Sequence, residues 1–182
     1  MKILTIDDTK WGNIIIAQLL EKHQMKDHAI FFASFNDDNN PEDIIRILAR
    51  KGCVIGSHTV SHPHLDQVSF GRAEYELRQS KKQIEKITNK KCVHFAYPHG
   101  EFSDEVIEQV REAGYKMART CEKQGDSVFK TPSFFLDGRN WKEAMETDLQ
   151  YYHLHFESLL LHNSIEQLDR FIAWMKQEGK CG

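Results

Sequence analysis

The sequence predicts an α/β fold in which a parallel β-sheet is covered by helices. Strand-like and helix-like segments alternate along the chain, and no linker, repeat or low-complexity stretch interrupts the alternation. The 182 residues suit one well-buried core, so we expect a single domain over residues 1–182. Repeated βα units in one domain imply a parallel sheet that is either doubly wound or closed into a barrel.

The first half of the chain supplies three strands and two helices. Strand-like apolar runs cover residues 2–7, 28–33 and 53–57. Two helical faces carry apolar residues at helical spacing: Ile15, Ile16, Leu19 and Leu20 within 12–23, and Ile44, Ile45 and Leu48 after Pro41. Pro41 suits the first turn of the second helix, and Gly52 suits its end.

The second half continues the alternation. Helices are expected at 70–88, after Ser103, at 141–149 and after Ser164, where Leu168, Phe171, Ile172 and Met175 form an apolar face. Strands or extended segments are expected at 92–97, 115–119, 129–136 and within 151–161. Ser103 and Ser164 suit the N-cap position, because a serine side chain accepts a hydrogen bond from a free N–H group of the first helical turn.

Charge and composition exclude two classes of protein. The formal net charge is −3 with scattered Lys and Arg, which is unlike the basic footprint of a nucleic-acid-binding protein. Apolar runs such as residues 14–17 are far too short to span a bilayer, so no transmembrane segment is expected. Met1 leads directly into the first strand, and the four cysteines show no Cys-x2-Cys spacing, so we expect a cytoplasmic protein.

Two pairs of side chains predict a metal site. Asp7 and Asp8 follow the first strand, and His58 and His62 follow the third. One carboxylate and two imidazoles leave a position open on a divalent ion, which is typical of hydrolytic centres where bound water has a pKa of about 7. The second carboxylate remains as a proton acceptor. Residues 97–100 follow the fourth strand, and functional groups of parallel sheets lie at such carboxyl ends.

Five segments carry a resemblance to a known family. Thr5 to Thr9 matches a T-F-D-D-G strand end, His58 to His62 an H-[ST]-x-x-H loop, and Ala96 to Gly100 an A-Y-P-x-G motif. Asp137 to Trp141 and Leu160 to His162 correspond more loosely to D-x-x-D-W and L-x-H. In this order the motifs resemble those of the polysaccharide deacetylases, the NodB-homology group of carbohydrate esterases. The resemblance covers residues 2 to 179 and implies a distorted (β/α) barrel.

The resemblance implies a role for each matching residue. The implied metal ligands are Asp8, His58 and His62, which would hold a divalent ion, most often zinc in this family. The implied substrate-binding residues are Tyr97, Pro98, Leu160 and Trp141, with Leu160 beside the acetyl methyl group. Asp7 would be the general base for the attacking water, and His162 would protonate the leaving amine. The backbone N–H of Tyr97 would stabilise the oxyanion.

Three positions depart from the family pattern. Thr9 stands where glycine is usual, and a β-branched residue disfavours a positive φ at this turn. Ala96 stands where many members have the arginine that orients the base, and Asn140 replaces an aspartate. The aspartate that Asn140 replaces would be a charge partner, and this partner is less needed where the arginine is also absent.

Two registers are open for the last strand. In the first, residues 157–163 form the strand and end at the catalytic His162. In the second, residues 153–158 form it, and Glu157 stands where the histidine is expected. The late-motif residue is therefore His162, His155 or Glu157, and we expect His162. The second register would leave the acid missing or replaced.

The sequence thus predicts a metal-dependent hydrolase that removes N-acetyl groups from an acetylated amino sugar or glycan. The missing export signal favours a cytoplasmic or membrane-surface glycan intermediate as substrate. A non-catalytic metal- and carbohydrate-binding relative is the main alternative, which Thr9 and the open identity of the acid favour. A phosphotransferase that uses Asp7 and Asp8 is disfavoured, because it needs a D-x-D spacing and leaves both histidines without a role.

Overall fold

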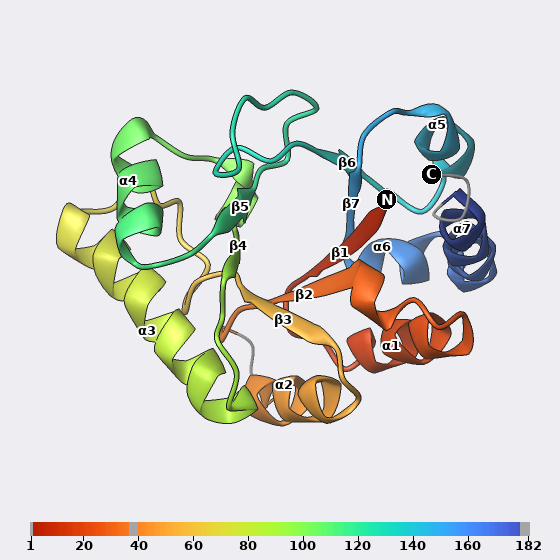
Figure 1. The fold of residues 1–182 in the computed structure, drawn as a ribbon, viewed down its shortest axis with the longest axis horizontal. Helices are drawn as coiled ribbons and strands as arrows, with labels where there is room; N and C mark the ends of the chain where they lie inside the picture. Colours follow the sequence, from red (N-terminus) through yellow and green to blue (C-terminus); the bar gives the residue numbers. More distant parts are fainter. Residues whose placement is uncertain (1, 37–39, 179–182) are drawn as a thin grey trace.

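Seven parallel strands form the central sheet of the protein (Figure 1). The computed structural model describes residues 2–36 and 40–178. Within them the strands are β1 (Ile3–Asp7), β2 (Ala29–Ala33), β3 (Val54–Ser57), β4 (His94–Ala96), β5 (Met117–Arg119), β6 (Ser133–Phe135) and β7 (Tyr151–Leu154). Their order is β5-β4-β3-β2-β1-β7-β6. β1, which carries Asp7 and leads into Asp8, is therefore an inner strand.

The segment between β5 and β6 joins the two edges of the sheet. Arg119 at the end of β5 forms a parallel bridge with Thr131, and the N–H of Ser133 donates to the carbonyl oxygen of Glu122 at 2.9 Å. Ser133 then begins β6, which pairs with β7 at the other edge. Because one segment contacts both edges, the sheet curls into a nearly closed barrel. The predicted distorted (β/α) barrel is confirmed.

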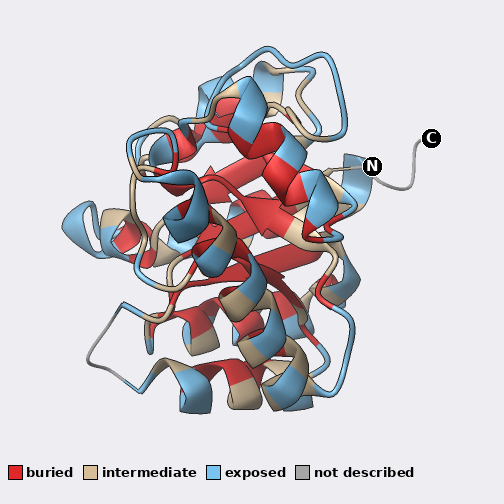
Figure 2. Ribbon diagram, turned by 90° about the vertical axis from the view of Figure 1, so that its left-hand side faces the viewer, coloured by how far each residue is buried: buried red, intermediate tan, exposed pale blue. Residues whose placement is uncertain are grey.

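Helices cover the outside of the barrel, and Figure 2 shows buried strands between helices with exposed outer faces. They are α1 (Asn13–Lys22), α2 (Pro41–Arg50), α3 (Phe70–Thr88), α4 (Asp104–Glu112), α5 (Trp141–Glu146), α6 (Phe156–Leu161) and α7 (Ile165–Glu178), with 3-10 turns η1 (Lys26–His28) and η2 (Pro98–Gly100). Ser103 caps α4 as expected, because its Oγ accepts a hydrogen bond from the N–H of Val106 at 3.2 Å. No helix in the described part of the chain is long and apolar enough to cross a membrane.

Apolar residues form two clusters, one on each side of the curled sheet. On β2, Phe31 belongs to the large outer cluster under the helices, whereas Ile30 and Phe32 belong to a small inner cluster. Gly56 of β3 lies beside Phe32 in the register. A Cβ atom at Gly56 would lie 2.5 Å from the Phe32 ring, so this inner position requires glycine. The guanidinium of Arg119 lies over the same ring at 5.5 Å, so polar groups rest directly on the inner cluster.

The last strand differs from the expected one. Residues 157–163 do not form a strand, because α6 occupies Phe156–Leu161, and the strand that pairs with β1 is β7. Leu160 and Leu161 lie in α6 and are exposed (61% and 79%). A short apolar run does not distinguish a strand from a helix, which explains the error.

The buried face of α1 also differs from the expected one. It consists of Asn13, Ile16, Ala17 and Leu20, whereas Ile15 is 43% exposed. The buried face of α1 is therefore rotated by part of a turn from the face that the apolar spacing predicts.

Candidate active site

A pocket of about 420 Å³ opens at the carboxyl ends of the strands. It is lined by Asp7, His58, His62, Tyr97, His99, Cys121, Phe135, His153 and His155. These residues come from β1, β6, β7 and the segments that follow β3, β4, β5 and β7. The pocket therefore lies where parallel α/β folds place their functional groups.

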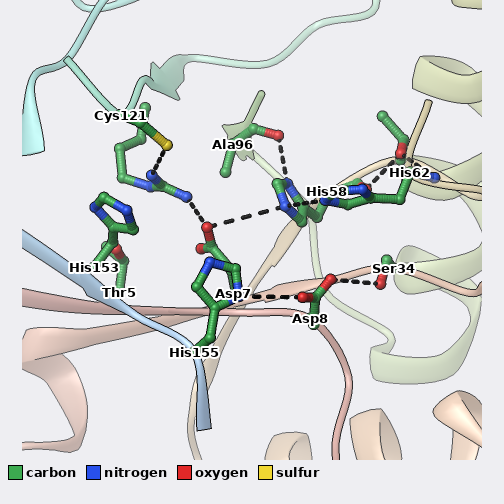
Figure 3. A network of polar contacts seen from close by, with 12 residues as sticks. Thr5, Asp7, Asp8, Ser34, His58, His62, Ala96, Cys121, His153 and His155 are labelled. Carbon is green, nitrogen blue, oxygen red and sulfur yellow. Dashed lines mark hydrogen bonds and ion pairs between the residues drawn. The ribbon is translucent and has the colours of Figure 1, made fainter. Parts of the chain in front are cut away.

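Asp8, His58 and His62 form a candidate metal-binding cluster. One ligand atom from each lies within 4.8 Å of the other two, and the Nε2 atoms of the two histidines are 3.0 Å apart (Figure 3). The Nδ1–H of His58 donates to the carbonyl oxygen of Ala96 at 2.8 Å, so the Nε2 of a neutral His58 carries a lone pair that faces the cluster. These are the donor atoms that a divalent ion such as zinc binds.

The charge states of this cluster suit a cation. Burial lowers the pKa of His58, and burial together with nearby His58 lowers that of His62 to about 4, so both rings are neutral at pH 7. Burial raises the pKa of Asp8, but the hydrogen bond from His155 and the neighbouring imidazoles outweigh it and lower that pKa to about 2. With its ring proton on Nδ1, the neutral His62 would add a second lone pair beside that of His58 and the carboxylate of Asp8, a donor set that fits a divalent ion.

Unusual backbone conformations place these ligands. Asp8, Thr59 and His62 have positive φ angles of 66°, 69° and 55°, which cost energy in residues other than glycine and persist only where the surroundings hold them. Thr9 does not share this conformation. Its Oγ1 donates to the carbonyl oxygen of Ser34 at 2.7 Å and accepts from the Ser34 N–H at 3.1 Å. The concern that a β-branched residue is strained at position 9 is therefore removed.

Glu76 of α3 anchors the loop that carries the histidines. Its buried carboxylate accepts hydrogen bonds from the N–H groups of Val60 (2.7 Å) and Ser61 (2.9 Å) and from the Ser61 hydroxyl (2.6 Å). Arg72 balances its charge at 2.6 Å. The loop between His58 and His62 is thus held by a helix on the outside of the barrel.

Asp7 is paired with Arg119, a residue that lies in none of the sequence motifs. Both side chains are buried, and a guanidinium nitrogen of Arg119 donates to Oδ2 of Asp7. Burial raises the pKa of Asp7, but the charge of Arg119 and the nearby histidines lower it below its usual value. The other oxygen, Oδ1, is buried and has no hydrogen-bond partner among the described residues. Asp7 is therefore ionised and offers one free oxygen.

His155 lies beside the metal-binding cluster. It directly follows β7, and its Nδ1 lies 3.2 Å from Oδ2 of Asp8 (Figure 3). Burial alone would lower its pKa, but the hydrogen bond to Asp8 and the charges of Asp7 and Asp8 raise it above the usual value. His155 is therefore a proton donor that stays protonated to a higher pH than a free histidine.

Several residues expected at the site lie elsewhere. His162 follows α6, is exposed and does not line the pocket. Leu160 is exposed on α6, and Glu157 is an exposed residue 3.8 Å from Lys10. Trp141 is buried against Phe171, and its Nε1–H donates to the Gly138 carbonyl at 2.9 Å. The structure brings none of these four to the pocket.

The Tyr97–Pro98 segment lies at the site but not as expected. Tyr97 lines the pocket, whereas Pro98 is buried in η2 outside the lining. The backbone N–H of Tyr97 donates to the carbonyl oxygen of Arg119 at 3.1 Å, so it is not free for an oxyanion. The hydroxyl group of Tyr97 donates to the Phe129 carbonyl at 3.0 Å.

Four pocket residues lie in no motif of the sequence and were not expected there: Arg119, His153, Cys121 and Phe135. His99 belongs to the A-Y-P-x-G motif, whose segment was expected at this rim. The signal that was available is positional: Arg119 ends a predicted strand, and His153 lies within one. An ionisable residue inside a strand of a parallel sheet needs a buried partner.

Comparisons with known proteins agree with this arrangement. Residues 2–118 match the family described as polysaccharide deacetylase. The chain is 28% identical over 179 residues to the uncharacterised protein YlxY of Bacillus subtilis, covering 93% of this chain and 51% of that protein. It is 24% identical over 176 residues to the peptidoglycan-N-acetylmuramic acid deacetylase PdaA of Bacillus subtilis, covering 90% and 61%. The chain thus spans about half to three fifths of the length of these relatives.

Solved structures share the fold. A family 4 carbohydrate esterase from Bacillus anthracis superposes with a TM-score of 0.75 at 22% identity, covering 97% of this chain and 76% of that chain. A mutant of a family 4 pseudoenzyme with restored enzymatic activity gives a TM-score of 0.75 at 23% identity, covering 98% and 63%. The matched family, which covers more than half of the sequence, and the barrel with its motifs at one rim lead to one assignment: the chain belongs to the polysaccharide deacetylase family.

Proposed function

We propose that this protein is a metal-dependent hydrolase that removes the acetyl group from an N-acetylated amino sugar. The observation that carries the proposal is the position of the Asp7–Arg119 ion pair beside the cluster of Asp8, His58 and His62. A divalent ion bound there would acidify water and polarise the acetyl carbonyl. We propose zinc, because one carboxylate and two imidazoles with an open position are typical of catalytic zinc sites.

Asp7 is the proposed general base. Its Oδ1 is ionised, buried and without a hydrogen-bond partner among the described residues, so it can take a proton from the water that attacks the acetyl carbon. Arg119 holds the other oxygen and keeps the carboxylate from rotating. Geometry and charge thus favour the acceptor role for Asp7 and the ligand role for Asp8.

His155, rather than His162, is the proposed general acid. An amine is a poor leaving group unless it receives a proton, and His155 is the histidine with a raised pKa in the pocket. The carboxylate of Asp8 fixes its Nδ1, so the Nε2–H of the protonated ring is available to the leaving nitrogen. The sequence expectation for the late motif is thus replaced by the residue that ends β7.

We propose an acetylated glycan or amino sugar as substrate and residues 1–182 as one catalytic domain. Two relatives support the substrate class: PdaA is named a peptidoglycan-N-acetylmuramic acid deacetylase, and another relative, from Azorhizobium caulinodans, a chitooligosaccharide deacetylase. The expected cytoplasmic location stays a prediction.

The test is acetate release from N-acetylated sugar oligomers by the zinc-loaded protein. Asp7→Asn should keep the metal and lose activity about a hundredfold or more, because the variant removes the base and not a ligand. Asp43→Asn, an exposed residue of α2, is the matched control. If the wild type binds metal and sugars but releases no acetate, the non-catalytic alternative replaces the proposal.

A further inference from the structure

His153 lies in the pocket wall and has no role in the mechanism above. Its side chain is only 3% exposed. In the sheet register it lies between Thr5 of β1 and Phe135 of β6, so it shares the inner face of the barrel with Thr5 and with Asp7, two residues further along. The Phe135 ring stacks on the imidazole with centroids 4.9 Å apart. The ring is therefore held in one orientation at the wall.

A chain of hydrogen bonds fixes the proton of His153. The Ser133 hydroxyl donates to the Thr120 carbonyl oxygen at 2.6 Å, because a carbonyl group can only accept. The only hydroxyl proton of Ser133 is then used, so its oxygen accepts from Nδ1–H of His153 at 2.9 Å. Burial and the charge of Arg119 lower the pKa of His153 to about 3, so the ring is neutral and Nε2 carries a lone pair.

This lone pair is available to a bound molecule. Within residues 2–36 and 40–178 no group forms a hydrogen bond with Nε2, although the residue lines the pocket. Nε2 is not among the described buried polar atoms that lack a hydrogen-bond partner, so solvent in the pocket reaches it, and a donor from a ligand would replace that solvent. The amide nitrogen is assigned to His155, whose ring centroid lies 6.4 Å from that of His153. The substrate group that donates a hydrogen bond to His153 is therefore a neighbour of the scissile amide and not the amide nitrogen itself.

We propose that His153 determines specificity by accepting a hydrogen bond from a substrate hydroxyl next to the scissile amide. The hydroxyl belongs either to the acyl group, as in an N-glycolyl sugar, or to carbon 3 of the sugar ring. This inference rests on the proposed function. It adds that the pocket selects substrates by a hydroxyl donor and not only by the acetyl methyl group.

The test compares three disaccharides: N,N′-diacetylchitobiose, its N-glycolyl counterpart and its 3-deoxy counterpart. Acyl release gives kcat/KM, and calorimetry gives Kd. The wild type should discriminate about tenfold or more against the compound that lacks the recognised hydroxyl, because its absence leaves Nε2 unpaired. His153→Leu should abolish this discrimination in both readouts while metal content is kept. His94→Leu on β4, which lies outside the pocket lining, is the matched control.

The outcomes separate the sources and the proposals. If the 3-deoxy compound has a lower kcat/KM and a higher Kd than N,N′-diacetylchitobiose, His153 recognises the ring hydroxyl. If the N-glycolyl compound has a higher kcat/KM and a lower Kd than N,N′-diacetylchitobiose, His153 recognises the acyl hydroxyl. If His153→Leu does not fold, His153→Gln, which keeps an acceptor, should retain part of the preference. Acetate release without any hydroxyl preference, or a preference that survives His153→Leu, overturns this inference alone. If no sugar is hydrolysed, the proposed function fails, and the Kd ratios still decide the role of His153.

Discussion

Arg119 of β5 forms a buried ion pair with Asp7 of β1, although β4, β3 and β2 lie between these strands in the sheet. The pair therefore crosses the inside of the barrel. Ala96, the position where many relatives are expected to carry the arginine that orients the base, lies directly beside Arg119 in the β4–β5 register. The guanidinium group thus comes from the neighbouring strand, which explains how Ala96 is compatible with an oriented base.

Replacing Arg119 should impair both stability and the base. In Arg119→Met, burial of Asp7 is no longer opposed by a positive charge, so its pKa should rise and the acidic limb of the kcat/KM profile should move to higher pH. Breaking a buried pair costs about 3–5 kcal/mol in the free energy of unfolding. Urea unfolding and pH–rate profiles measure both effects, with exposed Arg111→Met on α4 as control.

The pH dependence of this stabilisation has a definite sign. The folded-state pKa of Asp7 lies below the ordinary 3.8, so the pair stabilises the wild type fully above about pH 4 and less as pH falls through the folded pKa. In Arg119→Met, stability at low pH should approach that of the wild type. A constant difference between pH 2 and pH 7 would contradict the pairing.

The cluster of Asp8, His58 and His62 should bind about one divalent ion. His58→Ala and His62→Ala should each lose the ion, while His23→Ala, at the end of α1, should keep it. Elemental analysis measures the stoichiometry, and circular dichroism checks the fold. A chelator should lower the Tm of the wild type, because a ligand of the folded state stabilises it by mass action. If both histidine variants still bound one ion per chain, this cluster would not be the metal site.

His155 and His162 give opposite expectations. His155→Gln should lower kcat with little change in metal content and should remove the basic limb of the pH profile, because the raised pKa of His155 sets the pH above which the acid loses its proton. His162→Gln should leave both unchanged, since His162 is exposed beyond α6. Activity that depends on His162 and not on His155 would reverse the assignment.

Glu76 should act on the metal through the histidine loop. Glu76→Gln replaces one acceptor oxygen by a donor that faces backbone N–H groups, so the loop at Val60 and Ser61 should loosen. Residues that position metal ligands typically change affinity by about 10–100-fold. Competition with a chromophoric chelator measures the change, and Glu74→Gln, at a half-exposed position on the same helix, is the control. Unchanged affinity would limit Glu76 to a structural role.

The hydroxyl of Thr9 should be required for stability. Thr9→Val leaves the buried N–H and carbonyl groups of Ser34 without this partner, which costs about 1–3 kcal/mol. Thr9→Ser keeps the hydroxyl and should lose less. Urea unfolding of the two variants compares them, and equal losses would show that the methyl group matters instead.

The fold was largely predictable because its signals are local. The span expected for α3, 70–88, matches Phe70–Thr88, and the apolar face expected for the last helix is buried in α7. Asp8, His58 and His62 could be selected because their spacing has a chemical meaning in the sequence itself, and the structure places them together.

The rest of the site depends on distant pairing. Arg119 can pair with Asp7 only after the sheet has curled into a barrel and brought the two side chains together. No local sequence pattern predicts that contact. The sequence favoured His162 over His155 because the short apolar run before His162 resembles a strand. In the structure this run forms α6, where Leu160 and Leu161 are exposed. Which of two apolar runs pairs with β1 is decided by tertiary packing.

The order of the strands has a consequence for synthesis on the ribosome. β1 is synthesised before the other six strands. One of its two edges can pair only after Tyr151–Leu154 of β7 has been synthesised, and the carboxylate of Asp7 can pair only after Arg119 has been synthesised. Until those residues emerge, the nascent chain exposes an apolar strand with an unpaired edge, a state that favours aggregation. Slow translation between residues 57 and 119 should therefore lower the soluble yield more than slow translation after residue 154.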